Sequence, residues 1–291
     1  MKHNYGDYGN PSGGYTPQGT ESVSQTLDAV TTTKPHVAKT GKDRVENFVF
    51  RAMYADDRDA HLHPPDLYNA AKLYFDEASD VLRLLNRLAC MALGCPGGSD
   101  GASEEYLNDF FWDRTGSNFD ANPGNGNSLR LSYYPPQSAP ERECGAEECA
   151  ASERLRYGAH TDYQTFTILL QDPRDHRDGF GGLEVLVDDA WVPVVPPEGG
   201  LPGTVSFVVN CGDLTRVLTN GRWKSNLHRV ANPTSAAGWA YGRVSVPFFT
   251  GPKDDVVVHP LESTIESEGG RFYESVGAKE HLMKKLGLSN E

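Results

Sequence analysis

The hydrophobic period of the chain changes at Ser128, and this change constrains the fold more than any other feature. From Ser128 to His259, short apolar runs alternate with a period of two residues and are separated by Gly, Asn, Asp and Pro turn signals. The expected strands are 128–134, 165–171, 183–187, 191–194, 205–210, 226–231, 243–249 and 256–259. Many short strands with turns between them are typical of a β-sandwich or a barrel. The sequence therefore predicts a mainly β fold with flanking helices.

The stretch before this change has a helical period. Between Pro65 and Leu93, apolar residues recur at the spacing of one helix face, and Gly94 follows as a stop signal. We interpret this helix as one that packs against the sheets and supports them. Shorter helices are expected at 104–112 and 278–286. The predicted units are an N-terminal region with supporting helices (1–127), a β domain (128–262) and a C-terminal segment whose helix packs on that domain (263–291).

The chain is acidic, with a formal net charge of −13 over 291 residues. A nucleic-acid partner calls for a basic footprint, so this balance disfavours nucleic-acid binding. The longest apolar runs are too short to span a bilayer, so we expect no membrane association. The expected partner is a small molecule, and no obligate protein partner is evident in the sequence.

The cysteine usage indicates a reducing compartment. The five cysteines are Cys90, Cys95, Cys144, Cys149 and Cys211. Their number is odd and no secretory signal precedes them, so we expect a cytoplasmic protein with free thiols. Cys144 and Cys149 could form half of a zinc site, but no second pair lies nearby, which favours surface thiols. His61 and His63 are interpreted as solvated loop residues.

The motif with the most chemical information is His160-Thr161-Asp162, followed much later by His228 in another apolar run. Side chains at i and i+2 lie on one side of an extended chain, so His160 and Asp162 can reach one metal ion where a strand runs into a turn. His228 must then come from a different strand. Two imidazoles and one carboxylate occupy one face of an iron(II) ion and leave positions open for other ligands.

Four motifs in one order make residues 128–252 resemble the iron(II)/2-oxoglutarate-dependent oxygenases, in their isopenicillin N synthase-like branch. The matching segments are 129–136, 158–163, 219–233 and 243–249. The resemblance implies a distorted double-stranded β-helix, which is a jelly-roll barrel with iron in its mouth. Residues 14–19 resemble a segment that lies several tens of residues into the chains of this family. We therefore expect an N-terminal region that is short relative to the family.

The resemblance also implies an activity. The protein would be a non-haem dioxygenase that uses Fe(2+), 2-oxoglutarate and O2 to oxidise an unactivated C–H bond of a small organic metabolite. Hydroxylation, desaturation and cyclisation all occur in the family, with release of succinate and CO2. His160, Asp162 and His228 would be the metal ligands, with no catalytic side chain beyond them.

Arg243 and Ser245 share strand parity, so both can face the interior. An interior arginine needs an anion, because an unpaired buried charge is costly. The resemblance implies that Arg243 and Ser245 hold the 5-carboxylate of 2-oxoglutarate, with Tyr134 as a further donor. The alternative is that Arg243 pairs with a structural Asp or Glu.

Arg156 and Phe249 are the candidate substrate residues. Arg156 has the parity of His160 and could meet a substrate carboxylate, or it could form a salt bridge at the rim of the barrel. Phe249 and Tyr163 could line the site or belong to the core. Two other functions stay open, namely an oxidase of the same family that works without 2-oxoglutarate, and a non-catalytic barrel that binds a small molecule.

Overall fold

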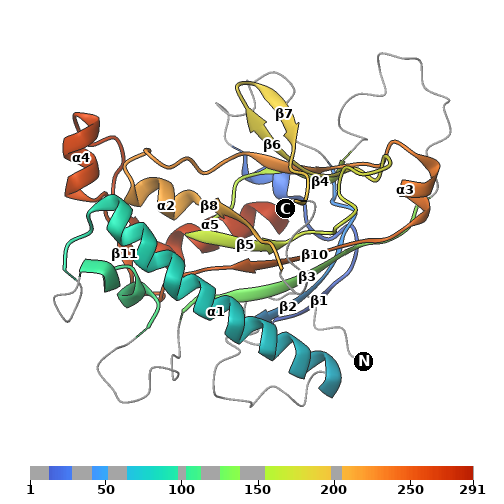
Figure 1. Ribbon diagram of the computed structural model, residues 1–291, viewed down its shortest axis with the longest axis horizontal. Helices are drawn as coiled ribbons and strands as arrows, with labels where there is room; N and C mark the ends of the chain where they lie inside the picture. Colours follow the sequence, from blue (N-terminus) through green and yellow to red (C-terminus); the bar gives the residue numbers. More distant parts are fainter. Residues whose placement is uncertain are drawn as a thin grey trace.

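A computed structural model describes residues 13–27, 41–51, 64–97, 103–112, 125–137, 155–197 and 205–290 (Figure 1). The expectations for His61, His63, Cys144 and Cys149 lie outside these residues. Among the described residues, no helix combines the length and the apolar character that crossing a membrane requires.

Strands and short helices alternate through most of the chain. The strands are β1 (Gly13–Thr16), β2 (Glu46–Arg51), β3 (Ser128–Tyr134), β4 (Leu155–His160), β5 (Phe166–Leu170), β6 (Gly182–Val187), β7 (Ala190–Pro193), β8 (Val208–Cys211), β9 (His228–Ala231), β10 (Arg243–Phe249), β11 (Val257–Val258) and β12 (Val276–Gly277). The α-helices are α1 (Pro65–Leu93), α2 (Asp213–Leu218), α3 (Ala236–Ala240), α4 (Glu262–Glu268) and α5 (Ala278–Asn290), and the 3-10 turns are η1 (Val23–Thr26), η4 (Ser103–Glu105) and η5 (Asn108–Phe110).

Two antiparallel sheets form the body of the molecule. The larger has the order β1-β2-β3-β10-β5-β8, and the smaller has the order β4-β9-β6-β7. A third sheet contains only β11 and β12. In Figure 1 the smaller sheet lies above the larger one, and no strand pairing joins the two among the described residues. The expected mainly β fold with flanking helices is confirmed.

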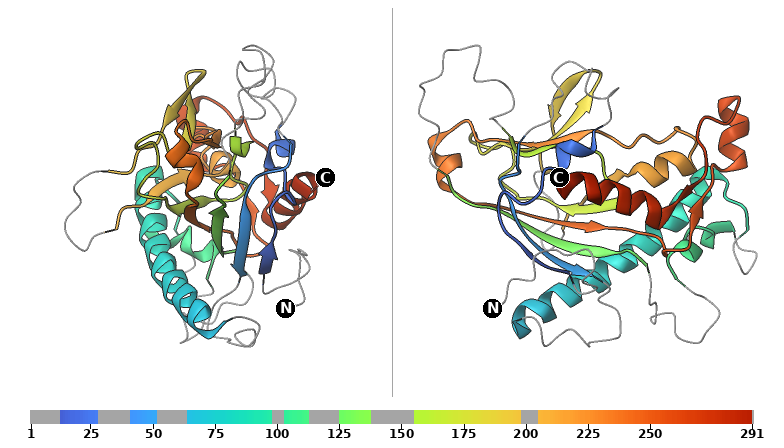
Figure 2. Two further views of the ribbon diagram at one scale, coloured as in Figure 1. Left: turned by 90° about the vertical axis from the view of Figure 1, so that its right-hand side faces the viewer. Right: turned by 180° about the vertical axis from the view of Figure 1, so that it is seen from behind.

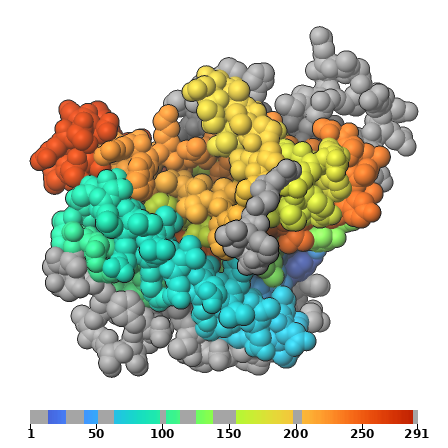
Figure 3. All heavy atoms as spheres, viewed as in Figure 1, coloured from blue at the N-terminus to red at the C-terminus, as the bar shows by residue number. Residues whose placement is uncertain are grey.

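Helix α1 covers the outer face of the larger sheet, and the space-filling view shows it along the front of the molecule (Figure 3). Phe75 of α1 and Phe248 of β10 are fully buried and meet edge to face, with ring centroids 5.0 Å apart. Gly94 ends the helix in the left-handed conformation at φ 62°, which glycine adopts without steric cost. Helices α1 and α5 lie on opposite sides of the molecule (Figure 2). The predicted supporting helix is therefore confirmed with its bounds.

The face of the larger sheet that points away from α1 is polar. In β10, Phe248 points at α1, so the alternation of side chains places Arg243 and Ser245 on the opposite face. Ser245 lies beside Ser132 of β3, which in turn lies beside Asn47 of β2. All of these polar side chains are buried. This inner face is therefore a place where polar groups are held away from solvent.

Several elements differ from the expectation. The helix expected at 104–112 is replaced by two short 3-10 turns, η4 and η5, and the strand expected at 205–210 begins later, at Val208. The C-terminal helix extends to Asn290 rather than ending at residue 286. Strands β1 and β2, which the sequence did not predict, extend the larger sheet beyond β3. Periodicity fails for such elements because two to six residues carry too few repeats.

Candidate metal centre and neighbouring carboxylate site

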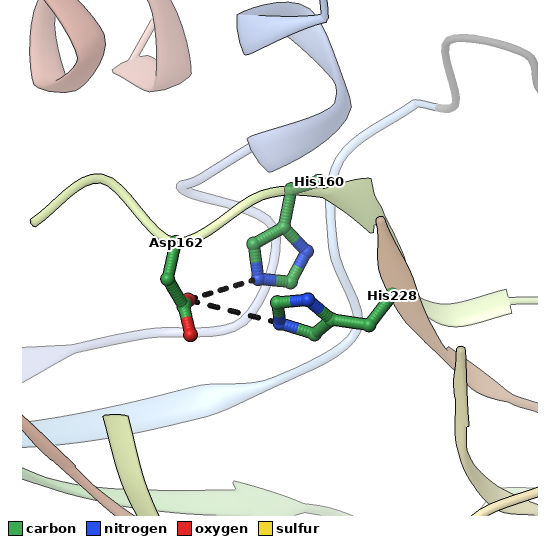
Figure 4. Close-up of side chains that lie close together, drawn as sticks. All are labelled: His160, Asp162 and His228. Carbon is green, nitrogen blue, oxygen red and sulfur yellow. Dashed lines mark ion pairs between the residues drawn. The ribbon is translucent and has the colours of Figure 1, made fainter. Parts of the chain in front are cut away.

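The two histidines of the motif come from adjacent strands. His160 is the last residue of β4 and His228 is the first residue of β9, and they lie opposite each other in the antiparallel register. Asp162 follows β4 in the turn, so its side chain reaches the same point from the other side (Figure 4). The expectation of a strand that runs into a turn, with the second histidine on another strand, is confirmed.

The three side chains converge closely enough for one metal ion. Their ligand atoms all lie within 4.8 Å of one another. His160 Nε2 lies 3.8 Å from Asp162 Oδ1, and His228 Nε2 lies 3.7 Å from the same oxygen. Figure 4 shows both rings turned towards the carboxylate. Within the described part of the chain, this is the one cluster of His, Cys, Asp or Glu with such geometry.

Backbone contacts fix which ring nitrogen is available. His160 Nδ1 lies 2.9 Å from the carbonyl oxygen of Gly158, and His228 Nδ1 lies 3.0 Å from that of Asn226. A carbonyl oxygen can only accept, so each Nδ1 carries the proton and each Nε2 presents a lone pair. Burial, and then the neighbouring His228, hold the pKa of His160 below its ordinary value. The His160 ring is therefore a neutral donor, as metal ligation requires.

Two hydrogen bonds from neighbouring side chains orient the carboxylate of Asp162. Thr167 Oγ1 and Asn210 Nδ2 both donate to Asp162 Oδ2, each at 2.6 Å, which leaves Oδ1 facing the two imidazoles. Burial alone would raise the pKa of Asp162, but the two histidines and these two hydrogen bonds outweigh it and keep the pKa below its usual value. Asp162 is therefore ionised and aimed before any ion binds.

A tight turn holds the backbone of this segment. Asp213 N–H donates to the Asp162 carbonyl oxygen at 2.8 Å, and Leu214 N–H donates to the Gln164 carbonyl oxygen at 2.9 Å. A Cβ atom on Gly212 would lie 2.4 Å from the carbonyl oxygen of Gln164, so only glycine fits there. The start of α2 thereby fixes the position of Asp162.

The three residues expected to hold a carboxylate lie together on the inner face. Arg243 and Tyr134 are partners in the β10–β3 register, and the Arg243 guanidinium carbon lies 4.9 Å from the centre of the Tyr134 ring. Arg243 Nη1 donates to Ser245 Oγ at 3.1 Å. All three side chains are buried.

Arg243 also has an acidic partner that the sequence did not identify. Its Nε donates to Asp175 Oδ1 and its Nη2 to Asp175 Oδ2, both at 2.7 Å. The pairing with a structural carboxylate, which was the open alternative for Arg243, is therefore present. Burial alone would lower the pKa of Arg243, but Asp175 outweighs it and raises that pKa above its ordinary value.

Arg156 does not lie at the rim. Its side chain is 1% exposed, and among the described residues no carboxylate lies within ion-pair distance of it. Its Nη2 donates to the carbonyl oxygens of Gly238 and Tyr241, at 3.3 and 3.4 Å. Its Nε is buried and makes no hydrogen bond. Of the two interpretations of Arg156, the salt bridge at the rim has no partner among the described residues, and the contact with a substrate carboxylate stays a prediction.

Phe249 and Tyr163 have different surroundings. Phe249 lies beside Thr167 in the β10–β5 register, on the inner face that also carries Arg243. The Arg130 guanidinium carbon lies 5.5 Å from the centre of the Phe249 ring, and Arg130 forms an ion pair with Glu21 at 3.1 Å. Tyr163 contacts Lys285 of α5. Phe249 thus lies near the residues that hold Asp162, and its substrate role stays a prediction.

The residues that the sequence reasoning missed are polar side chains that act on the predicted ones: Thr167, Asn210, Asp175 and Arg130. Strand parity could have found Thr167, because it faces the same side as its register partner Phe249. Asp175 lies in the segment between β5 and β6, where no repeat indicates its direction. Its contact with Arg243 could be found only in three dimensions.

Comparison with known proteins supports the geometry. Residues 125–252 match the family model described as "2OG-Fe(II) oxygenase superfamily". This range contains the three residues of the metal cluster and Arg243.

Curated relatives match over part of their length. The chain is 34% identical over 190 residues to gibberellin 20 oxidase 2 of Oryza sativa subsp. indica, which covers 65% of the chain and 37% of that protein. It is 34% identical over 226 residues to gibberellin 3-beta-dioxygenase 1 of Arabidopsis thaliana, covering 77% and 52% respectively. The chain thus spans about half the length of these relatives, or less.

The fold also matches a solved structure. The rice dioxygenase for auxin oxidation superposes with a TM-score of 0.58 at 25% identity, covering 84% of this chain and 68% of that one. The expected architecture, two antiparallel sheets arranged as in the double-stranded β-helix of these oxygenases, is confirmed.

Proposed function

Residues 125–252 belong to the 2OG-Fe(II) oxygenase superfamily, and from this premise we propose that the protein is an iron(II)- and 2-oxoglutarate-dependent dioxygenase. Its substrate is a small organic metabolite with an unactivated C–H bond. The reaction takes up one O2 per substrate, oxidises 2-oxoglutarate to succinate and CO2, and leaves the second oxygen atom on the substrate as an alcohol. Desaturation and cyclisation are variants of the same oxidation.

The convergence of His160, Asp162 and His228 is the observation that carries this proposal. Two neutral imidazoles and one ionised carboxylate are the donor set that non-haem iron(II) oxygenases use. Both Nε2 lone pairs and Asp162 Oδ1 face one point, and the remaining polar atoms of all three side chains are tied to the protein. The donor set thus fits iron(II). Bound there, iron supplies the activation of O2, which no side chain can provide.

The inner face beside the metal cluster would hold the cosubstrate. Arg243 and Ser245, with Tyr134 next to them, form a buried group of donors suited to the 5-carboxylate of 2-oxoglutarate. Burial excludes water from this carboxylate and strengthens each charge-assisted hydrogen bond. Phe249, the register partner of Thr167 on the same face, would contact the substrate.

Metal binding provides the first test. Anaerobic calorimetry with iron(II) should show one site per chain, and His160→Ala, Asp162→Ala and His228→Ala should each abolish it, since each removes one of only three ligands. His259→Ala is the matched control, because His259 bonds Ser275 and is outside the cluster. Adding 2-oxoglutarate to the iron-loaded protein should then produce a visible charge-transfer band. Tight iron binding by Asp162→Ala would refute the assignment.

A second function, an oxidase of the same family that does not use 2-oxoglutarate, is favoured by one observation. Arg243 is already paired with Asp175, so its charge has a partner within the protein. The two functions differ in stoichiometry, because only the dioxygenase releases one succinate per product. Turnover of a substrate panel without succinate would favour the oxidase. Iron binding without any O2 uptake across that panel would favour a non-catalytic binding protein.

A further inference from the structure

Arg243 uses only one of its two edges to bind Asp175. The Nε and Nη2 atoms donate to the two carboxylate oxygens, each at 2.7 Å, while Nη1 points at Ser245 Oγ. A guanidinium group has a second fork, formed by Nη1 and Nη2, that can receive another carboxylate end-on. Asp175 can therefore fix the orientation of Arg243 without blocking a ligand.

Asp175 is itself held firmly in place. Its Oδ2 also accepts from Gln171 Nε2 at 3.2 Å and from the Leu183 N–H at 3.4 Å. A Cβ atom on Gly182 would lie 2.6 Å from the Asp175 carboxyl carbon, so the backbone of β6 packs directly against this side chain. Releasing Asp175 from Arg243 would break several buried contacts and leave a buried carboxylate unpaired, which is costly.

Arg156 is a second buried cation in the same region. Burial and then the charge of Arg243 lower the pKa of Arg156, while Tyr134, Asp175 and Asp172 act in the opposite direction. Arg156 Nη2 also lies 3.4 Å from the carbonyl oxygen of Tyr241, two residues before Arg243, so the two cations lie in the same region. The Arg156 guanidinium has no carboxylate partner among the described residues, and its Nε is an unsatisfied buried donor.

Among the residues that the structure describes, the charges of this region do not balance. Three guanidinium groups, of Arg156, Arg174 and Arg243, face two carboxylates, of Asp172 and Asp175. Asp172 pairs with Arg174 and Asp175 pairs with Arg243, so the uncompensated charge is that of Arg156. One further carboxylate would make the region neutral without displacing any existing pair. An uncompensated buried charge is costly, so the region favours such an anion.

We propose that Arg156 is the second cation of the cosubstrate site, and that one carboxylate of a dicarboxylic acid binds between Arg156 and the free fork of Arg243, which Asp175 positions. This inference rests on the proposed function for the identity of the dicarboxylate. It assigns Arg156 to the cosubstrate rather than to a carboxylate of the primary substrate. Asp175 is a positioning residue, since it acts through Arg243.

Glutarate is the probe that tests this proposal. It has the two carboxylates of 2-oxoglutarate but no 2-oxo group, so its affinity reports on the carboxylate site in the absence of metal. Calorimetry on the metal-free protein should give an affinity about tenfold or more weaker for Arg156→Gln, because one charge-assisted contact is lost. Arg156→Lys, which keeps the charge, should recover part of it. Arg271→Gln removes the same charge from a more exposed arginine that pairs with Glu262 and is outside this group of charges, and it should bind glutarate as the parent does.

The variant Asp175→Asn distinguishes two possible roles of Asp175, which either positions Arg243 or competes with the ligand for it. Without its carboxylate, Arg243 is no longer fixed, so glutarate affinity should fall by about tenfold, while iron(II) affinity at the separate metal cluster stays at the parent value. Asp254→Asn is the control, because Asp254 pairs with Lys279 and is outside this group of charges. Tighter glutarate binding by Asp175→Asn would overturn the proposal, since it would show that Asp175 competes with the ligand.

A measurement on the parent protein keeps the test decisive if a variant does not fold. Hydrogen exchange should slow in β4 around Arg156 and in residues 238–243 when glutarate is added, because the ligand bridges these segments. Unchanged exchange in β4 at saturating glutarate would also overturn the proposal. Failure of the proposed function would look different, as an absence of iron binding or of succinate release with glutarate binding intact.

Discussion

The hydroxyl of Thr167 should control metal affinity without touching the metal. It donates to Asp162 Oδ2 at 2.6 Å, together with Asn210 Nδ2 at the same distance. Thr167→Val keeps the shape of the side chain and removes this donor. The carboxylate would then be held by one hydrogen bond and could turn away from the two histidines.

The size of the effect follows from the chemistry of the contact. A hydrogen bond to a charged group contributes about 1.5–3 kcal/mol, and about 1.4 kcal/mol corresponds to a tenfold change in affinity. Loss of such an outer contact typically weakens metal binding by about 10- to 100-fold. We therefore expect the iron(II) dissociation constant of Thr167→Val to rise by about 10- to 100-fold.

Anaerobic calorimetry with iron(II) measures this change directly. Thr167→Ser, which keeps the hydroxyl, should bind iron like the parent, and Thr167→Val combined with Asn210→Ala should bind more weakly than either single variant. Denaturant unfolding of the metal-free proteins shows whether the fold is retained. If Thr167→Val bound iron as tightly as Thr167→Ser, the hydroxyl would have no role in orienting Asp162.

Two further predictions concern stability. Phe75→Ala should lower the free energy of unfolding by about 3–5 kcal/mol because it opens a cavity against Phe248. Leu73→Ala, on the exposed side of α1, should change it by about 0.5 kcal/mol or less. Equal losses for the two variants in denaturant titrations would contradict this packing. Burial raises the pKa of Asp43 from 3.8 to about 7, so its stabilising contribution is full below about pH 4 and is lost as the pH rises through about 7. Between about pH 5 and pH 8 the parent should lose about 2 kcal/mol more stability than Asp43→Asn, and parallel pH profiles would refute the raised pKa.

The sequence predicted the metal cluster because its geometry is local. His160 and Asp162 are two residues apart at the end of a strand, so strand parity determines their common direction. The prediction that His228 lies on another strand needed only the second apolar run. Helix α1 was predicted with its bounds for a similar reason, since 29 residues carry many repeats of the helical period.

The contacts that orient Arg243 and Arg156 could not be predicted in the same way. Asp175 lies between β5 and β6 and meets Arg243 from β10, a separation of 68 residues. The segment contains residues with positive φ, such as His176 and Asp178, so it follows no strand or helix period. Sequence parity placed Arg156 correctly in the interior, but whether it has a partner depends on how β4 packs beside residues 238–241.

The inner face of the larger sheet contrasts with Arg156, which lies on β4 of the smaller sheet. Buried polar groups are normally satisfied by the protein itself, because each unpaired group costs free energy. Asn47 accepts from Ser132, Arg130 pairs with Glu21, and Arg243 pairs with Asp175. Arg156 differs from Arg130 and Arg243 because it has no carboxylate partner among the described residues, and its Nη2 makes only two long hydrogen bonds to carbonyl oxygens. A fold that pairs the buried arginines of this face with carboxylates, and leaves Arg156 without one among the described residues, has the charge pattern of an anion-binding site.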